Sequence, residues 1–248
     1  MVTGGYAGVM LASVDNEAVV MAVLADRFRL PMDRLVPGEV AIAEVEHPSL
    51  PVRAFSREGG AVLAVAPRHA PLLRQHLHGP ATLLPALEAV AARLPGHLFS
   101  GVARTGVAIP PPAVEVTVLD AIDPRLPDWV HGHFTGEAWV VLDDHGTVLS
   151  TAVLKRYDDR LREISVGTAE AARGRGLGRA VVAAAARTVL SEGRAVLYNH
   201  APDNYASARV AESVGLHEFG RYHAIVPDRR LGAEYGEDDA TSNNTDNR

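Results

Sequence analysis

The stretch from Ile164 to Leu190 constrains the fold more than any other part of the chain. It reads ISVGTAEAARGRGLGRAVVAAAARTVL and places three glycines and three arginines within residues 173–179. An alternating apolar run precedes this cluster, and an alanine-rich run of helical length follows it. The sequence therefore predicts a strand, a glycine-rich turn and a helix in immediate succession.

A glycine-rich turn that opens a helix can bind an anion. The first backbone N–H groups of a helix have no partner inside it, and glycine lets the backbone approach a phosphate closely. The helix dipole adds about half a positive charge at the same end. A pyrophosphate is therefore a natural ligand, and Arg173, Arg175 and Arg179 add nonspecific attraction.

Two common phosphate loops do not fit this turn. The nucleoside-triphosphate loop requires a lysine and then a serine or threonine after its glycines, where this chain has Arg179 and Ala180. The dinucleotide fingerprint, begun at Gly174, would require glycine at position 179. It also requires a strand that starts a βαβ unit, whereas the preceding strand here belongs to a predicted antiparallel meander.

The rest of the carboxyl-terminal half has a readable order. Residues 114–120 alternate like a strand, and residues 137–168 read as three strands joined by turns. The remaining elements follow in chain order: a helix over 177–191, a short strand over 195–199, a helix over 204–214 and a last strand over 217–226.

The amino-terminal half differs in composition. The prolines at 110–112 cannot sit inside a helix or a central strand, so they predict a linker. We expect residues 1–110 to form a smaller α/β domain that shapes part of the functional site or an oligomer interface, or that is a degenerate copy of the second domain. Its predicted strands cover residues 38–46 and 59–66, and its predicted helices cover 67–77 and 81–94. The almost wholly polar residues 231–248 predict a disordered tail.

Two segments carry a family resemblance. Arg173, Gly176 and Gly178 have the spacing [Q/R]-x-x-G-x-[G/A], which resembles the acetyl-CoA pyrophosphate loop of the GNAT N-acetyltransferase superfamily. A second segment resembles the family's other CoA-contacting region and places Asn204 and Ser207 at its N-x-x-[AS] pattern, with Gly215 and Leu216 at its closing G-F. The resemblance covers roughly residues 114–226. It implies an α/β (α+β) fold over residues 113–230, with a mixed, mostly antiparallel sheet flanked by helices.

The resemblance also implies a reaction. Family members transfer an acetyl or other short acyl group, not an amino-acyl group, from CoA directly to an amine in a ternary complex. A backbone N–H of the central strand polarises the thioester carbonyl, and the glycine turn holds the cofactor. The implied acetyl-CoA contacts are Val166, Gly167, Thr168, Arg173, Gly174, Arg175, Gly176, Leu177, Gly178, Arg179, Asn199, Asn204 and Ser207.

The sequence does not decide which residues act as general acid and general base. Glu163 precedes the turn on the same strand and is the candidate general base, but a cross-strand ion pair with Arg156 is an equal alternative. The position of the tyrosine that many relatives use as general acid is Ala211, which leaves Tyr205 as a substitute. An alternative reading is therefore a catalytically silent CoA-binding regulatory or interaction module.

Composition limits the partners. The absence of cysteine excludes disulfides and thiolate chemistry, and the histidine spacings predict no metal site. A net charge of −6 argues against nucleic acid, and no apolar run approaches the roughly 18 residues that cross a bilayer. Because the first thirty residues contain several acidic side chains, we expect a cytoplasmic protein without membrane contact. The predicted acceptor is a small-molecule or peptide amine, and residues 1–110 are the part of the chain expected to shape the acceptor site. The sequence leaves open whether the protein forms a homodimer.

Overall fold

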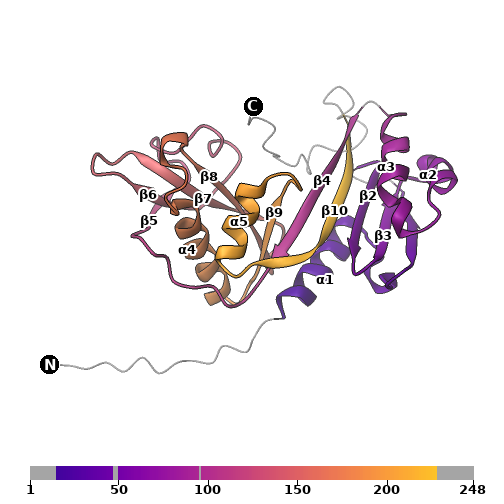
Figure 1. Ribbon diagram of the computed structural model, residues 1–248, viewed down its shortest axis with the longest axis horizontal. Helices are drawn as coiled ribbons and strands as arrows, with labels where there is room; N and C mark the ends of the chain where they lie inside the picture. The colour runs from indigo at the N-terminus through magenta and orange to yellow at the C-terminus, as the bar shows by residue number, and fades with distance from the viewer. Residues whose placement is uncertain (1–14, 47–49, 95, 228–248) are drawn as a thin grey trace.

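The computed structural model describes residues 15–46, 50–94 and 96–227 (Figure 1). Within them, ten strands form one continuous sheet in the order β1-β3-β2-β10-β4-β9-β8-β7-β6-β5. Only the pairs β1–β3 and β8–β9 are parallel, and the other neighbours are antiparallel. The predicted fold class, a mixed and mostly antiparallel sheet flanked by helices, is therefore confirmed.

The elements of the amino-terminal half were only partly predicted. The predicted strands and helices correspond to β1, β3, α2 and α3, whereas α1, β2 and β4 were not predicted. In chain order the elements are α1 (Asn16–Phe28), β1 (Val40–Glu44), β2 (Val52–Arg57), β3 (Gly60–Val65), α2 (Ala70–His76), α3 (Leu83–Ala91) and β4 (Gly96–Thr105). Short 3₁₀ turns cover Met32–Arg34, Pro67–His69 and Pro80–Thr82.

The elements of the carboxyl-terminal half agree closely with prediction. The helix predicted over residues 177–191 has those bounds, and the predicted meander is the antiparallel run β6–β7–β8. In chain order the elements are β5 (Thr117–Asp120), β6 (Glu137–Leu142), β7 (Val148–Arg156), β8 (Leu161–Thr168), a 3₁₀ turn (Glu170–Ala172), α4 (Leu177–Ser191), β9 (Ala195–His200), α5 (Tyr205–Ser213) and β10 (His217–Pro227).

The sheet does not divide at the predicted domain boundary. Strand β4 lies between β9 and β10, and β10 also pairs with β2, so strands from both predicted domains alternate in the middle of the sheet. The prolines at 110–112 lie between β4 and β5. The boundary at residue 110 therefore marks a change in sequence character without a break in the sheet. The predicted tail, residues 231–248, lies outside the described residues.

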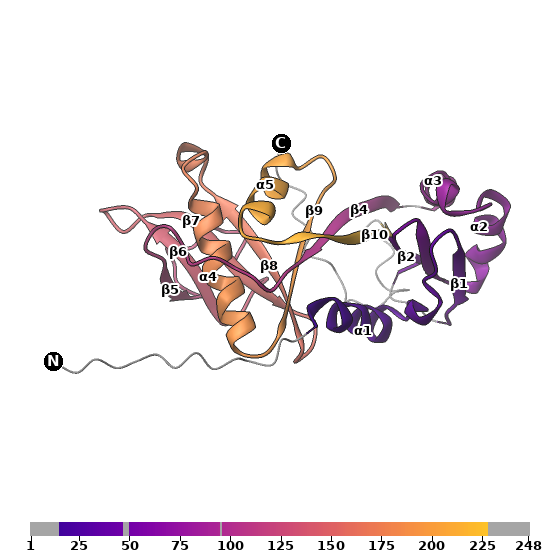
Figure 2. The ribbon, with the colours of Figure 1, turned by 60° about the horizontal axis from the view of Figure 1, so that its bottom comes forward.

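Helices cover both sides of the sheet. We call the side that α4 and α5 cover the α4 face, and the opposite side the α1 face. On the α4 face, apolar residues of α4 and α5 pack on Trp139, Ile164 and Tyr198. On the α1 face, Val20, Val23 and Leu24 of α1 pack against Phe55, Ala103 and Leu197. Figure 2 shows α1 on one side of β2 and β4, with α3 on the other.

The local sequence explains why helix α1 forms. Asp15 precedes it, and the Asp15 carboxylate accepts a hydrogen bond from the backbone N–H of Ala18 at 3.1 Å. Its apolar residues recur three and four apart, so Val20, Val23 and Leu24 share one buried side. No helix in the described part of the chain has the length and apolar character needed to cross a membrane.

Candidate active site

The centre of the candidate site is a gap between two parallel strands. Strands β8 and β9 pair only from Leu161 opposite Ala195 to Glu163 opposite Leu197. Beyond that point β8 stays paired with β7 as far as Thr168, while β9 continues along β4 as far as His200. The two strands therefore diverge, and their facing edges beyond residue 163 have no strand between them.

Backbone amides face this gap. The N–H of Ala169 donates to the carbonyl of Leu149 at 2.9 Å, which directs the odd-numbered amides of β8 toward β7. Because alternate residues of a strand direct their N–H groups to opposite edges, the amides of Val166 and Thr168 point toward the gap. Two of the three strand residues predicted to contact the cofactor thus present donors at the required edge.

The glycine turn connects the end of β8 to the start of α4 on the α4 face. Gly174 and Gly176 have φ values of +77° and +76°, a conformation that strains other residues, and space beside both is open. Gly178 packs closely, because a Cβ there would lie 3.2 Å from the hydroxyl of Thr168. The 15-residue helix α4 therefore begins next to the end of β8, and the N–H groups of its first turn, which have no partner inside the helix, lie at the glycine turn.

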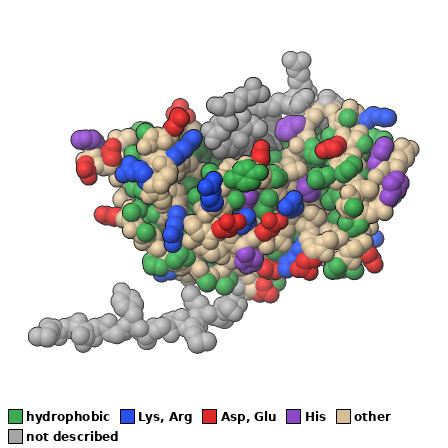
Figure 3. Space-filling model, viewed as in Figure 1, with side chains coloured by type: hydrophobic (Ala, Val, Ile, Leu, Met, Phe, Trp, Pro, Cys, Tyr) green, Lys and Arg blue, Asp and Glu red, His purple; other side chains and the backbone are tan. Residues whose placement is uncertain are grey.

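Three arginines surround this helix start. The side chains of Arg173, Arg175 and Arg179 are exposed, and none forms an ion pair with a carboxylate among the described residues. Basic side chains, blue in Figure 3, also appear over the α4 and α5 part of this face. The turn, the helix dipole and the unpaired arginines together fit an extended polyphosphate.

The second predicted segment begins at α5. Asn204 is its N-cap: the side-chain oxygen accepts the N–H of Ser207 at 3.0 Å. The Ser207 hydroxyl lies 2.7 Å from the hydroxyl of Tyr198 on β9, and burial raises the pKa of Tyr198 to about 12. Ala211 is fully buried one turn further along α5. These contacts hold α5 against β9 at the edge of the gap.

Both ring nitrogens of His200, at the end of β9, have hydrogen-bond partners. Its Nε2 accepts a hydrogen bond from Nε of Arg104 at 2.9 Å, and its Nδ1 lies 2.8 Å from the carbonyl oxygen of Ala201. Because an acceptor nitrogen carries no proton, His200 has no proton on Nε2 to donate. Arg104 also pairs with Glu212 of α5 at 3.0 Å, so this cluster joins β4, β9 and α5.

Glu163 lies on the opposite side of the sheet, in a pocket under α1. Its carboxylate accepts a hydrogen bond from the Tyr157 hydroxyl at 2.5 Å. The alternative prediction of an ion pair between Glu163 and Arg156 is wrong, because Arg156 pairs with Asp159 and lies opposite Arg162 in the strand register. Glu163 therefore makes no ion pair with Arg156, and it lies at the last position where β8 pairs with β9.

The pocket around Glu163 combines aromatic rings with three side chains that are charged or carry an amide, namely Lys155, Glu163 and Asn199. Asn199 contributes a buried side-chain oxygen that has no hydrogen-bond partner among the described residues. The lining residues come from seven elements and the residue after β7: Leu24, Phe28, Phe55, Phe99, Ala103, Lys155, Tyr157, Glu163, Leu197, Asn199 and Tyr222. We call this the Glu163 pocket. Its aromatic members were not predicted, because no short sequence motif connects them.

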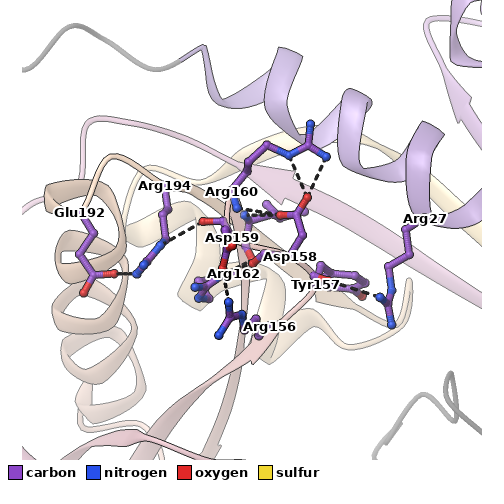
Figure 4. A network of polar contacts seen from close by, with 10 residues as sticks. Arg27, Arg156, Tyr157, Asp158, Asp159, Arg160, Arg162, Glu192 and Arg194 are labelled. Atoms are coloured by element: carbon purple, nitrogen blue, oxygen red, sulfur yellow. Dashed lines mark hydrogen bonds and ion pairs between the residues drawn. The ribbon is translucent and has the colours of Figure 1, made fainter.

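A polar network attaches α1 to the turn between β7 and β8 (Figure 4). Arg160 bridges Asp158 in this turn and Asp26 of α1, at 2.8 and 2.7 Å. Arg27 of α1 donates to the backbone carbonyl of Tyr157 at 3.3 Å. The carboxyl-terminal end of α1 is therefore attached next to the Glu163 pocket.

The predicted site residues thus fall into two groups. The turn residues and the strand amides lie on the α4 face or at the gap, together with Asn204 and Ser207. Glu163 and Asn199 lie in the pocket on the α1 face, and Tyr205 is 69% exposed at the start of α5, outside that pocket. No cluster of three or more potential metal ligands occurs in the described residues.

Comparison with known families gives one match. Residues 110–216 match the model of a family described as the acetyltransferase (GNAT) family. This span contains the gap, the glycine turn and α5, but neither α1, β2, β4 nor β10. No curated protein sequence matches the chain.

Several solved structures are similar to the chain. A GCN5-related N-acetyltransferase-like protein from Streptococcus suis has 17% identity and a TM-score of 0.49, over 85% of this chain and 100% of that chain. A GCN5-related N-acetyltransferase from Kribbella flavida has 16% identity and a TM-score of 0.44, over 90% and 99% of the two chains. An acetyltransferase from the GNAT family of Colwellia psychrerythraea has 12% identity and a TM-score of 0.42, over 56% of this chain. The match spans 60% of the Colwellia protein, which is less than two thirds of its length.

Proposed function

We propose that the chain transfers an acetyl or other short acyl group from CoA directly to an amine, because residues 110–216 match the model of the GNAT acetyltransferase family. The observation that carries this proposal is the gap between β8 and β9. On its α4 face lies a turn that fits a pyrophosphate, and on its α1 face lies a pocket that contains a carboxylate. A thioester in the gap and an amine in the pocket could therefore meet.

The residues of the α4 face are suited to hold the donor. The amides at the start of α4 and the exposed Arg173, Arg175 and Arg179 would bind its pyrophosphate. The amides of Val166 and Thr168 would hydrogen-bond along the gap and polarise the thioester carbonyl. Asn204 and Ser207 would act mainly by fixing α5, since their side chains already make the cap and the Tyr198 contact.

The proposed reaction conserves protons. The lone pair of the neutral amine attacks the thioester carbonyl carbon, a C–N bond forms and the C–S bond breaks. The nitrogen loses one proton, which Glu163 would accept directly or through water, and the departing thiolate gains one. Tyr205 stays our predicted proton donor to the thiolate, and Asn199 moves from a predicted cofactor contact to the acceptor pocket.

Binding of acetyl-CoA tests the donor site by isothermal titration. Gly176→Asp introduces a negative charge and a strained φ at the start of α4, so the Kd should rise at least about 100-fold. Gly146→Asp is the matched control, because Gly146 has a similar φ of +80° in the β6–β7 turn and equally open space. Equal binding by wild type and Gly176→Asp would overturn the assigned site.

Release of the CoA thiol across a panel of amines tests the reaction. An N-acyltransferase should release thiol only when both acetyl-CoA and a suitable amine are present. If acetyl-CoA binds but no amine supports turnover, the silent CoA-binding module is the better interpretation.

A further inference from the structure

The free space in the Glu163 pocket is small. It amounts to about 40 Å³, and about 10–15 Å³ of free space is enough for one water molecule. The walls resist widening, because the centre of the Phe28 ring lies 5.6 Å from that of Tyr222 and 5.9 Å from that of Tyr157. The pocket therefore has room for an amino group and one or two carbon atoms, and the rest of an acceptor must lie outside it.

The charges that line the pocket suit a neutral amine. Glu163 and Lys155 lie opposite each other in the strand register, and they are the only charged side chains among the described residues that line the pocket. Because their charges cancel, the pocket does not strongly favour the protonated amine. The Glu163 carboxylate accepts a hydrogen bond from Tyr157 and has further lone pairs for a proton of the amine.

A tryptophan covers the same face of β8 further along the strand. Gly167 follows Glu163 by four residues, so both lie on the α1 face. A Cβ at Gly167 would lie 2.9 Å from Cζ2 of Trp129, so any side chain there would displace the indole. Gly167 is not among the residues with positive φ, and the close approach of the ring therefore explains the glycine. The indole thus lies beside the gap that the amides of Val166 and Thr168 face.

The position of Trp129 is fixed by packing. Trp129 belongs to residues 121–136 between β5 and β6, and its ring meets the Phe134 ring edge-on at 5.8 Å. It also packs against the buried apolar cluster that this segment forms with β6 and β7. The side chain is only half-buried, which leaves part of the indole open to contact. Glu163 and Gly167 are about 13 Å apart along the strand, at roughly 3.3 Å per residue, so a chain that leaves the pocket can run toward the indole.

We propose that the acceptor is a primary amine on an unbranched carbon atom. Its amino group enters the mouth of the Glu163 pocket, and its carbon chain packs on Trp129. An α-amine is disfavoured, because the carbon atom next to it carries two further chains, and the pocket wall and the indole leave a path for one. This inference rests on the proposed function, since it takes the α1 face of the gap as the acceptor side. It makes Trp129 a residue that determines specificity.

Two isomers of acetylated lysine amide test this preference. Nα-acetyl-lysinamide carries its free amine on an unbranched carbon atom, and Nε-acetyl-lysinamide carries it on the branched α-carbon. The α-amine has a pKa of about 7.8, against about 10.4 for the side-chain amine, so at pH 7 it is more often neutral. Against this intrinsic order, kcat/KM for thiol release should be at least about tenfold higher with Nα-acetyl-lysinamide. An equal or reversed preference would overturn the inference even though both isomers release thiol.

Variants of Trp129 test its contact with the carbon chain. Trp129→Leu keeps an apolar side chain but removes the ring, so KM for Nα-acetyl-lysinamide should rise about tenfold while the Kd for acetyl-CoA stays the same. Ile122→Ala is the matched control, because Ile122 lies in the same segment and is 77% exposed. It should keep the wild-type KM. An unchanged KM in Trp129→Leu would remove Trp129 from the acceptor site.

Contact with the indole can also be measured without acyl transfer. Because the chain has two tryptophans, labelling with 5-fluorotryptophan gives two ¹⁹F signals, and Trp129→Phe identifies the one from Trp129. With CoA present, Nα-acetyl-lysinamide should shift this signal and leave that of Trp139, which is buried on the α4 face, in place. A Trp129 signal that does not move would overturn the contact.

The outcomes distinguish this inference from the proposed function. If acetyl-CoA does not bind, or if no amine supports thiol release, the proposed function fails and the inference fails with it. If thiol is released but the two isomers are used equally, only the inference fails, and the chain remains an N-acyltransferase with another acceptor.

Discussion

The α4 face and the α1 face are built in different ways. On the α4 face, the proposed donor site comes mainly from one contiguous segment, from the end of β8 through the glycine turn into α4. On the α1 face, the Glu163 pocket draws on α1, β2, β4, β7, β8, β9 and β10, which span most of the chain. The first kind of site follows from local backbone geometry, and the second exists only once the whole sheet has formed.

This difference predicts that the two faces can be disabled separately. A change on the α1 face should affect the acceptor and the proton transfer while acetyl-CoA still binds. A change in the turn should do the reverse.

The largest expected effect is that of Glu163→Gln. Glutamine keeps the size and can still accept a hydrogen bond from Tyr157, but it cannot take a proton from the amine. We expect kcat to fall about 10²- to 10⁴-fold with an unchanged Kd for acetyl-CoA, measured by thiol release and titration calorimetry. Glu192→Gln, at the far end of α4 and paired with Arg194, is the control. A normal kcat for Glu163→Gln would remove Glu163 from the reaction.

The next effect concerns acid stability on the α4 face. His223 of β10 is buried beside Ser100, whose hydroxyl lies 2.9 Å from its Nδ1. Burial, with Arg221 nearby, lowers the pKa of His223 to about 4 from its usual 6.5. The neutral form is thus the stable one in the fold. The contribution of neutral His223 to the free energy of unfolding is fully present above pH 6.5. It is lost as the pH falls toward 4, by up to about 3 kcal/mol.

Denaturant unfolding at several pH values measures this loss. Wild type should lose stability between pH 6.5 and 4 more steeply than His223→Asn, which has no imidazole to protonate. Parallel curves for the two proteins would contradict the assignment. Acetyl-CoA affinity at pH 7 should be the same for both, because His223 lies outside the turn and the gap.

The contrast between the faces also explains what the sequence could predict. The meander, α4 and α5 follow from alternation, alanine content and an Asn cap, which are local signals, and the glycine turn follows with them. Strands β2 and β4 were missed because they carry buried charges: Arg53 stacks on the Phe28 ring at 4.3 Å, and Arg104 is satisfied by His200 and Glu212. A local pattern reads such residues as exposed.

The site shows the same limit. Glu163 was predicted as a site residue because it precedes the turn, but its hydrogen-bond partner is Tyr157 and Arg156 pairs elsewhere. Lys155 and the five rings become one pocket only through β4 and β10, whose insertion between the halves no short pattern in the sequence reveals.

A smaller effect should separate the two tyrosines near α5. Tyr198→Phe removes the buried contact with Ser207 and should lower the free energy of unfolding by about 1 kcal/mol. Tyr205→Phe should leave stability unchanged because its side chain is exposed. If Tyr205 donates the proton to the thiolate, Tyr205→Phe should lower kcat without changing the Kd for acetyl-CoA. A lower kcat in Tyr198→Phe alone would transfer that role to Tyr198.

The smallest effect is expected where α1 is attached by charge. Asp26→Asn removes the ion pair with Arg160, whose two side chains are mostly exposed. Solvent and salt screen such pairs, so the Tm should fall by only about 1–2 °C, and the difference from wild type should vanish in 1 M salt. Differential scanning fluorimetry at two salt concentrations measures this. The apolar contacts of Val20, Val23 and Leu24 would then be what holds α1 on the sheet. A much larger fall in Tm would instead make the charged turn the main support of the Glu163 pocket. Acceptor affinity should then depend on salt, while acetyl-CoA affinity in the same variant keeps its wild-type salt dependence.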